Sequence, residues 1–277
     1  MLTYVLSGGG MKGAWSAGVL DTLRKIETPS HIYGISVGAL NGVLLCAGIS
    51  PGNYWIKNVT KPSDLFESRS NLRLLRDLIF NKFDGFMGFE GLRKSLDSID
   101  WAAVRQSRIM LQTGAVNIGD GKIYYANPNF QDFKTHVLAS CAIPLVFPLV
   151  QISDSYYTDG GLCEVVPLKP AIEAGADEIV VVAPHPVNTR PKIFETRNPL
   201  DLVQRYADLI TENIIANDIA RAERINAEVL AGKRNDKRFV KIRIYRPEHE
   251  LGVSVSAFTA EDIKELVVLG RTTTFVE

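Results

Sequence analysis

The sequence predicts an α/β fold in which helices flank a mainly parallel central sheet. Two strand–loop–helix units follow one another before Pro51, and consecutive units of this kind imply neighbouring parallel strands. Both loops follow the carboxyl ends of their strands, where open α/β sheets carry their functional sites. The chain has 277 residues, 46% of them hydrophobic, which is enough for a substantial core.

Composition disfavours several broad classes of protein. The 31 basic and 31 acidic residues give a formal net charge of +0, so no global charge attracts nucleic acid or an anionic membrane. No apolar run approaches the roughly 18 residues that span a bilayer. We therefore expect neither a nucleic-acid partner nor a transmembrane segment.

The N-terminus and the cysteines indicate the compartment. Residues 1–6 lack the basic segment of a signal peptide and lead directly into a glycine loop. The three cysteines, Cys46, Cys141 and Cys163, have no metal-type spacing and suit a reducing compartment. We expect a cytoplasmic protein, with peripheral contact at membranes left open.

The first unit consists of a strand over Leu2–Leu6, a glycine loop and a helical pattern that Pro29–Ser30 breaks. Gly8, Gly10 and Gly13 fit the spacing of a dinucleotide-binding loop, but the second strand ends without the acidic residue that such sites use. The alternative is an oxyanion hole built from backbone N–H groups of the loop. The candidate residues are Gly8, Gly9, Gly10, Met11, Lys12 and Gly13.

The second unit carries a serine between a strand at His31–Tyr33 and a helix at Val37–Ala47. Gly34 and Gly38 flank Ser36 in a Gly-x-Ser-x-Gly pattern, which is typical of a nucleophile elbow. The alternative is an ordinary strand-to-helix turn with a serine N-cap. Ser36 is the candidate nucleophile.

Residues 51–106 form the least regular stretch. A helix is predicted over Leu72–Phe80, and aromatic residues then crowd around two glycines. Phe83, Phe86, Met87 and Phe89 are the candidate contacts to acyl chains or a lipid surface. This segment is either a mobile apolar flap over the site or a loop packed on the core.

The following segments alternate between strands and helices. We predict the strand Arg108–Val116 with a hairpin partner at Lys122–Tyr125, the helix Phe133–Ser140 and a second hairpin over Val150–Tyr157. That hairpin leads to Asp159, Gly160 and Gly161, where two glycines allow another group to approach the carboxylate. We then predict a short helix ending at Gly175, the strand Glu178–Ala183, a long helix from Asn198–Pro199 to about Gly232, the strand Phe239–Tyr245 and a last helix opened by Thr259.

A serine nucleophile needs a base, and the histidines are poorly suited. His31 starts the elbow strand, at the wrong end, while His136 and His249 lie in polar settings. The order Ser36, Asp159, His185 mimics an α/β-hydrolase, although that fold builds several strands before its elbow. Asp159 acting directly on Ser36 is the alternative, provided that burial raises its pKa.

Three ordered motifs resemble those of the patatin-like phospholipase family. They are Gly8–Gly13, Gly34–Gly38 and Asp159–Gly161, and Ala139–Pro144 resembles the segment before the family's aspartate loop. The resemblance spans Leu2–Ala183. It implies a three-layer fold in one domain over 1–277, with the motifs in 2–183 and the part 198–277 completing it.

The resemblance also implies a function. Ser36 is then the nucleophile, Asp159 its dyad base, and the glycine-loop amides the oxyanion hole, with no metal and no cofactor. The reaction is lipid acyl hydrolysis through an acyl-enzyme, on a lipid substrate met in transient contact with a membrane surface. Alternatives are a soluble esterase or thioesterase on short or carrier-bound acyl groups, and a nucleotide-binding module without catalysis.

Overall fold

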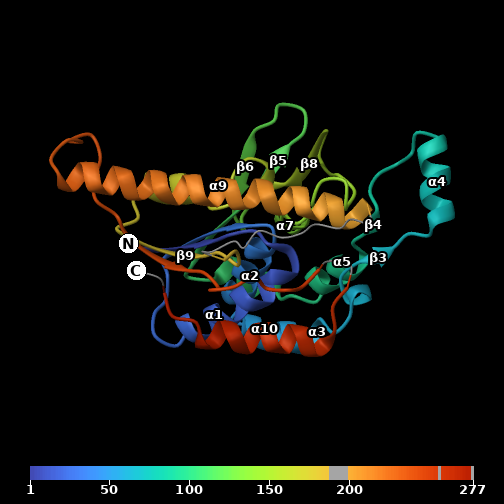
Figure 1. The fold of residues 1–277 in the computed structure, drawn as a ribbon, viewed down its shortest axis with the longest axis horizontal. Coiled ribbons are helices and arrows are strands. Elements are labelled where there is room, and N and C mark those ends of the chain that lie inside the picture. The colour runs from blue at the N-terminus through green and yellow to red at the C-terminus, as the bar shows by residue number, and fades with distance from the viewer. Residues whose placement is uncertain (187–198, 255–256, 276–277) are drawn as a thin grey trace.

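The computed structural model describes residues 1–186, 199–254 and 257–275 (Figure 1). The strands are β1 (Leu2–Leu6), β2 (His31–Ile35), β3 (Glu67–Ser68), β4 (Met87–Gly88), β5 (Met110–Asn117), β6 (Ile123–Ala126), β7 (Val150–Ile152), β8 (Ser155–Asp159), β9 (Glu178–Val182) and β10 (Lys241–Tyr245). The helices are α1 (Gly13–Leu23), α2 (Val37–Cys46), α3 (Pro51–Asn58), α4 (Asn71–Ile79), α5 (Glu90–Asp97), α6 (Trp101–Gln106), α7 (Phe133–Ser140), α8 (Leu168–Glu173), α9 (Pro199–Leu230) and α10 (Ala260–Thr272).

The central sheet is mainly parallel, as the sequence predicts. Its strand order is β10-β9-β1-β2-β5-β8-β7, and β6 pairs with β5. The strands from β10 to β5 run parallel, whereas β6, β7 and β8 join antiparallel. The carboxyl ends of β1, β2 and β9 therefore meet at one edge, so the loops that follow them lie close together.

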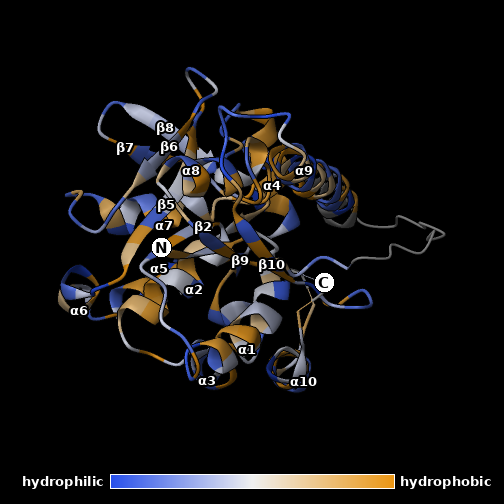
Figure 2. Ribbon diagram, turned by 90° about the vertical axis from the view of Figure 1, so that its left-hand side faces the viewer, coloured by the Kyte–Doolittle hydropathy of each residue, from blue (hydrophilic) through white to orange (hydrophobic). Residues whose placement is uncertain are grey.

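Helices cover both faces of the sheet and complete three layers. α1, α3 and α10 lie on one side and α8 and α9 on the other (Figures 1 and 2). The larger core fills the first side and includes Trp15, Leu44 and Val267. A second core includes Val181 of β9 and Ile215 of α9. Two-sided burial explains why β1 and β9 consist largely of apolar residues rather than alternating with polar ones.

Most predicted elements are confirmed, with small shifts at their ends. The helix predicted over Leu72–Phe80 is α4, and the strand predicted from Arg108 begins at Met110. Thr259 and Asp262 form the expected capping box at α10. The predicted N-cap of the long helix, Asn198, lies outside the described residues.

None of the helices in the described ranges is both long and apolar enough to cross a membrane.

The last elements of the chain pack on the first ones. β10 pairs with β9, and α10 packs along α1, where Gly18 and Gly270 allow close approach: a Cβ at Gly18 would lie 2.1 Å from the Val267 carbonyl oxygen. The C-terminal part thus shares the sheet and the core of the N-terminal part.

Candidate active site

The tight turn between β2 and α2 holds Ser36 in a strained backbone conformation. Its φ and ψ angles are 55° and −127°, a combination that costs a residue with a side chain about 1–3 kcal/mol. The flanking glycines are sterically required. A Cβ at Gly34 would lie 2.7 Å from the Gly38 carbonyl oxygen, and one at Gly38 would lie 2.2 Å from the Leu6 carbonyl oxygen. The turn therefore presents Ser36 at the start of α2, as a nucleophile elbow requires.

Two side chains at the end of α7 hold this elbow in place. The Ser36 N–H donates to Oγ of Ser140 at 3.0 Å, and Sγ of Cys141 donates to the Ser36 carbonyl oxygen at 3.2 Å. Both side chains are buried. In the sequence, no local pattern around Ala139–Pro144 indicates that these two side chains contact Ser36.

This contact leads to a stability prediction. Ser140→Ala is expected to lower the free energy of unfolding by about 1–3 kcal/mol, because the buried Ser36 N–H loses its acceptor. Urea denaturation measures the difference. Ser98→Ala is the matched control, since the exposed Ser98 hydroxyl only donates to the Ser95 carbonyl oxygen at 2.7 Å. Equal, small losses in the two variants would contradict the holding role of Ser140.

Asp159 reaches Ser36 from the opposite side of β5. In the sheet, Ile35 pairs with Gly114 and the next residue of β5, Ala115, pairs with Asp159. The ends of β2 and β8 therefore lie at the same level. Ser36 and Asp159 are each 5% exposed, and both line one pocket.

Burial sets the protonation behaviour of Asp159. It raises the pKa of the carboxyl to about 6, although hydrogen bonds from Ser36 and from the Gly161 N–H act in the opposite direction. The Gly161 bond measures 2.8 Å to Oδ1. A carboxyl group with this pKa is ionised near neutral pH and is a better proton acceptor than an exposed aspartate.

The glycine loop lies directly against the serine. A Cβ at Gly8 would lie 3.2 Å from Cβ of Ser36, and one at Gly13 would lie 2.1 Å from Cγ2 of Val37. Gly10 has a φ of 53°, in the left-handed region that favours glycine. Gly8, Gly9 and Gly10 line the same pocket as Ser36. The loop thus brings backbone groups to the serine that bulkier residues would keep away.

Helix α9 contributes a wall that the motifs do not reveal. Nζ of Lys12 forms a salt bridge of 3.1 Å with Oδ1 of Asp208, and both side chains are largely buried. Asp208, Ile210 and Thr211 also line the pocket. This salt bridge connects the glycine loop to α9, and the charge of Lys12 is paired with that of Asp208.

The histidines occupy four different settings. His31 begins β2, at the far end from Ser36, His136 is buried against Thr113 at 3.0 Å, and His249 is exposed. Only His185 lines the pocket with Ser36. Its Nε2 lies 3.3 Å from the Gly8 carbonyl oxygen, and burial, reinforced by the charge of Lys12, lowers its pKa to about 3. His185 is therefore neutral and contacts the glycine loop.

The remaining pocket lining is largely apolar. It includes Met87, Ile143, Val146, Leu162 and Val165, a surface that suits a hydrocarbon chain beside Ser36. In the described ranges, no three His, Cys, Asp or Glu side chains are grouped so that they could hold a metal ion.

The aromatic segment is divided between the core and the surface. Phe89 is buried and packs on Phe147 with ring centroids 5.8 Å apart, as expected for a loop packed on the core. Phe83 and Phe86 are half-buried and contact each other edge to face. Of the four candidate contacts, Met87 is the one that lines the pocket.

Comparison with known proteins adds relatives of low identity. The chain is 27% identical over 201 residues to "Uncharacterized protein YjjU" of Escherichia coli (strain K12), covering 65% of this chain and 51% of that one. It is 27% identical over 187 residues to "Probable lipid hydrolase 463L" of Invertebrate iridescent virus 6, covering 62% of this chain and 63% of that one. A solved structure, "Crystal structure of VipD from Legionella pneumophila", aligns with a TM-score of 0.48 and 15% identity over 97% of this chain and 65% of that one.

In each case the match spans less than two thirds of the relative's length. A family model gives the broader result: the model described as "Patatin-like phospholipase" matches residues 4–172. That range holds the glycine loop, the elbow and Asp159, and it covers more than half of the chain. The chain therefore belongs to the patatin-like phospholipase family.

Proposed function

We propose that this protein is a lipid acyl hydrolase that cleaves ester bonds of phospholipids or related lipids through a Ser36–Asp159 dyad. Membership of the family implies hydrolase activity on lipid esters. The observation that carries the dyad assignment is that Ser36, on its strained turn, lines the same pocket as the buried carboxylate of Asp159, whose pKa is raised to about 6. A pocket with apolar walls surrounds this pair.

The proposed reaction has two halves. Oγ of Ser36 attacks the ester carbonyl and passes its proton to Asp159, and the backbone amides of Gly8, Gly9 and Gly10 stabilise the oxyanion. The ester bond then breaks, and the departing alcohol takes the proton from Asp159. Water next gives a proton to Asp159 and attacks the acyl-enzyme, which releases the fatty acid and returns the proton to Ser36.

The environment of His185 favours the dyad over a triad. Its Nε2 faces the Gly8 carbonyl oxygen, and its Nδ1 is buried with no hydrogen-bond partner among the described residues. A triad histidine instead bonds the nucleophile and the carboxylate together. We assign His185 to the support of the glycine loop.

We also propose that residues 1–277 act as one domain. The C-terminal part supplies α9, whose Asp208 pairs with Lys12, as well as β10 and α10. A pocket wall and part of the core would therefore be lost if 198–277 were removed.

The substrate class is tested with a short-chain phospholipid, assayed below and above the concentration at which it forms micelles. We expect the rate of fatty-acid release to rise sharply above that concentration, because the apolar pocket then meets packed acyl chains. A soluble short-chain ester serves as the comparison, and Ser36→Ala as the blank. A rate that rises smoothly through the threshold, together with faster turnover of the soluble ester, would favour the esterase or thioesterase alternative.

The pH dependence follows from Asp159. The base must be ionised, so we expect kcat/KM to fall about tenfold per pH unit below about pH 6, where the carboxyl takes up a proton. Initial rates on a soluble ester at constant ionic strength measure this limb. The limb should persist in His185→Ala, because the pKa of His185 is about 3. Loss of the limb in that variant would assign it to the imidazole instead.

A further inference from the structure

Helix α4 turns an apolar face to solvent. Leu72, Leu75, Leu78, Ile79 and Phe80 are between 56% and 78% exposed. Four of them, Leu72, Leu75, Leu78 and Ile79, fall on one side of the helix by their spacing. α4 also projects from the body of the molecule (Figure 1). Single exposed apolar residues are common on proteins, but a contiguous group of this kind marks an interaction surface.

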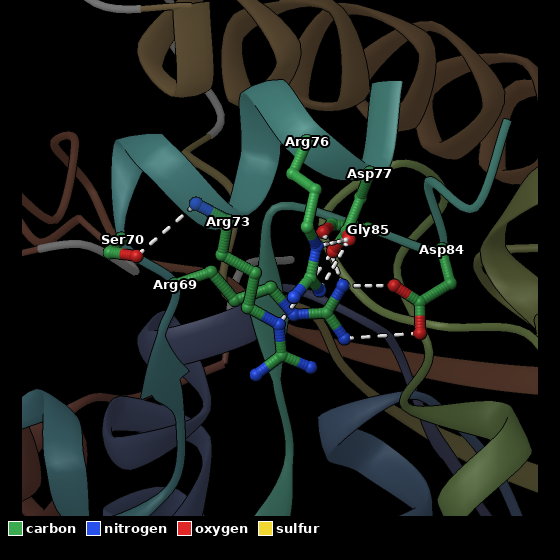
Figure 3. A network of polar contacts seen from close by, with 7 residues as sticks. All are labelled: Arg69, Ser70, Arg73, Arg76, Asp77, Asp84 and Gly85. Atoms are coloured by element: carbon green, nitrogen blue, oxygen red, sulfur yellow. Dashed lines mark hydrogen bonds and ion pairs between the residues drawn. The ribbon is translucent and has the colours of Figure 1, made fainter. Parts of the chain in front are cut away.

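The opposite side of α4 is charged, and its one buried residue is Asp77. Arg76 donates to Oδ1 of Asp77 from Nε at 2.9 Å and from Nη2 at 2.7 Å, and Nε of Arg73 lies 3.7 Å from Oδ2 (Figure 3). Asp77 is buried beneath these side chains. The amphipathic pattern of α4 is therefore inverted relative to that of a helix packed on a core.

A second contact fixes the start of this helix. Arg69, just before α4, donates to the Gly85 carbonyl oxygen at 2.9 Å and pairs with Asp84 through two hydrogen bonds (Figure 3). Only 5% of the Arg69 side chain is exposed. Ser70 caps the helix by accepting from the Arg73 N–H at 3.3 Å. These contacts hold α4 in the orientation that keeps its apolar face outward.

The chain after α4 leads to the rim of the candidate active site. The Phe86 N–H donates to the Leu145 carbonyl oxygen at 3.0 Å, and the Met87 N–H donates to that of Val146 at 2.8 Å. Met87 and Val146 line the pocket, whereas Leu145 is exposed beside them. The short segment between Ile79 and Phe86 therefore connects α4 to the rim of the pocket.

The net charge of residues 69–84 indicates which kind of surface α4 would bind. Residues 69–84 contain four basic residues and two acidic ones, so this segment, which includes α4, is basic although the whole chain has a net charge of +0. The side chains of Arg73 and Arg76 remain partly exposed. A basic helix with exposed leucine and phenylalanine binds at the headgroup level of anionic bilayers.

We infer that α4, with Phe80, docks into an anionic lipid surface and brings the Ser36 pocket to its substrate. This inference rests on the proposed lipid hydrolase function. The proposed membrane contact lies before Phe83–Phe89, the segment in which the sequence predicts contacts to lipid.

Binding to vesicles tests the inference without relying on turnover. Ser36→Ala is the background, so that the lipid is not consumed, and vesicles contain phosphatidylglycerol and phosphatidylcholine in equal parts. Adding Leu75→Glu and Ile79→Glu is expected to weaken co-sedimentation roughly tenfold or more, since two apolar contacts become negative charges. Vesicles of phosphatidylcholine alone should bind the Ser36→Ala protein more weakly than the mixed vesicles.

Leu230→Glu is the matched control. Leu230 is 73% exposed and is the last residue of α9. The C-terminal end of α9 lies at the end of the molecule opposite α4 (Figure 1). The substitution should leave vesicle binding unchanged. Circular dichroism melting verifies that all variants are folded.

Two results would overturn the inference. One is equal vesicle binding with and without the α4 substitutions. The other is a dimer in analytical ultracentrifugation that the same substitutions dissociate, since α4 would then contact a second copy of the chain. Failure of the hydrolase proposal is separate: the wild type would bind vesicles through α4 and release no fatty acid.

Discussion

Ser36→Ala is expected to lower the rate of fatty-acid release by roughly a thousandfold or more, because it removes the atom that forms the acyl-enzyme. The fold should survive. Alanine retains the Cβ and the backbone N–H that donates to Ser140. Release of fatty acid from phospholipid micelles, compared with the wild type at equal concentration, measures the loss.

Ser36→Gly separates catalysis from backbone strain. It should be as inactive as Ser36→Ala, yet it should unfold at a higher urea concentration, because glycine adopts a φ of 55° without steric cost. We expect a gain of about 1 kcal/mol over the alanine variant. Substantial activity in either variant would exclude Ser36 as the nucleophile.

Asp159→Asn is expected to reduce turnover by roughly a hundredfold to ten-thousandfold, the usual contribution of a general base. Asparagine keeps the shape of the side chain and an oxygen that can accept from the Gly161 N–H. Steady-state kinetics on the same micelles measure the loss. His185→Ala is the comparison and should lower the rate far less, and a loss as large as that of Asp159→Asn would indicate a triad.

Asp159→Asn is expected to raise the stability of the folded protein, although it lowers turnover. The pKa of Asp159 is raised in the folded protein, so the stabilisation linked to its proton is present at low pH and is lost as pH rises through about 6. A carboxyl whose pKa rises from 3.8 to about 6 makes the ionised form about 3 kcal/mol less favourable. Asp159→Asn should therefore be more stable than the wild type at pH 8 by up to that amount, and the difference should shrink at pH 5. Urea denaturation at both pH values checks this sign.

The fold and the elbow could be predicted from the sequence because their signals are local. Gly34 and Gly38 are required by contacts within a few residues or with the neighbouring strand β1. Parallel pairing of β1 and β2 follows from the helical crossover through α1 that connects them. In such segments the chain neighbours of a residue largely determine its conformation.

The supports of the site could not be predicted because they depend on distant contacts. Ser140 meets the Ser36 N–H across 104 positions, and Asp208 meets Lys12 across 196. Neither residue stands in a pattern that indicates a partner. The raised pKa of Asp159 likewise depends on burial by many elements rather than on its neighbours in the chain.

The sequence also could not show which side of α4 faces solvent. The periodicity of Leu72–Phe80 predicts an amphipathic helix, but it does not say whether the apolar face meets the core or solvent. In the structure the apolar side is exposed, and Asp77 is buried beneath Arg73 and Arg76. Phe89 is buried in the core, whereas Leu72 of α4 is exposed.

Labelling with a fluorophosphonate probe tests the central claim most directly. Peptide mapping of the wild type should find the adduct on Ser36, with labelling abolished in Ser36→Ala, strongly slowed in Asp159→Asn and retained in His185→Ala. That pattern is expected if Asp159 activates Ser36 directly. An adduct on another residue, or labelling that is lost in His185→Ala but unaffected in Asp159→Asn, would contradict the Ser36–Asp159 dyad.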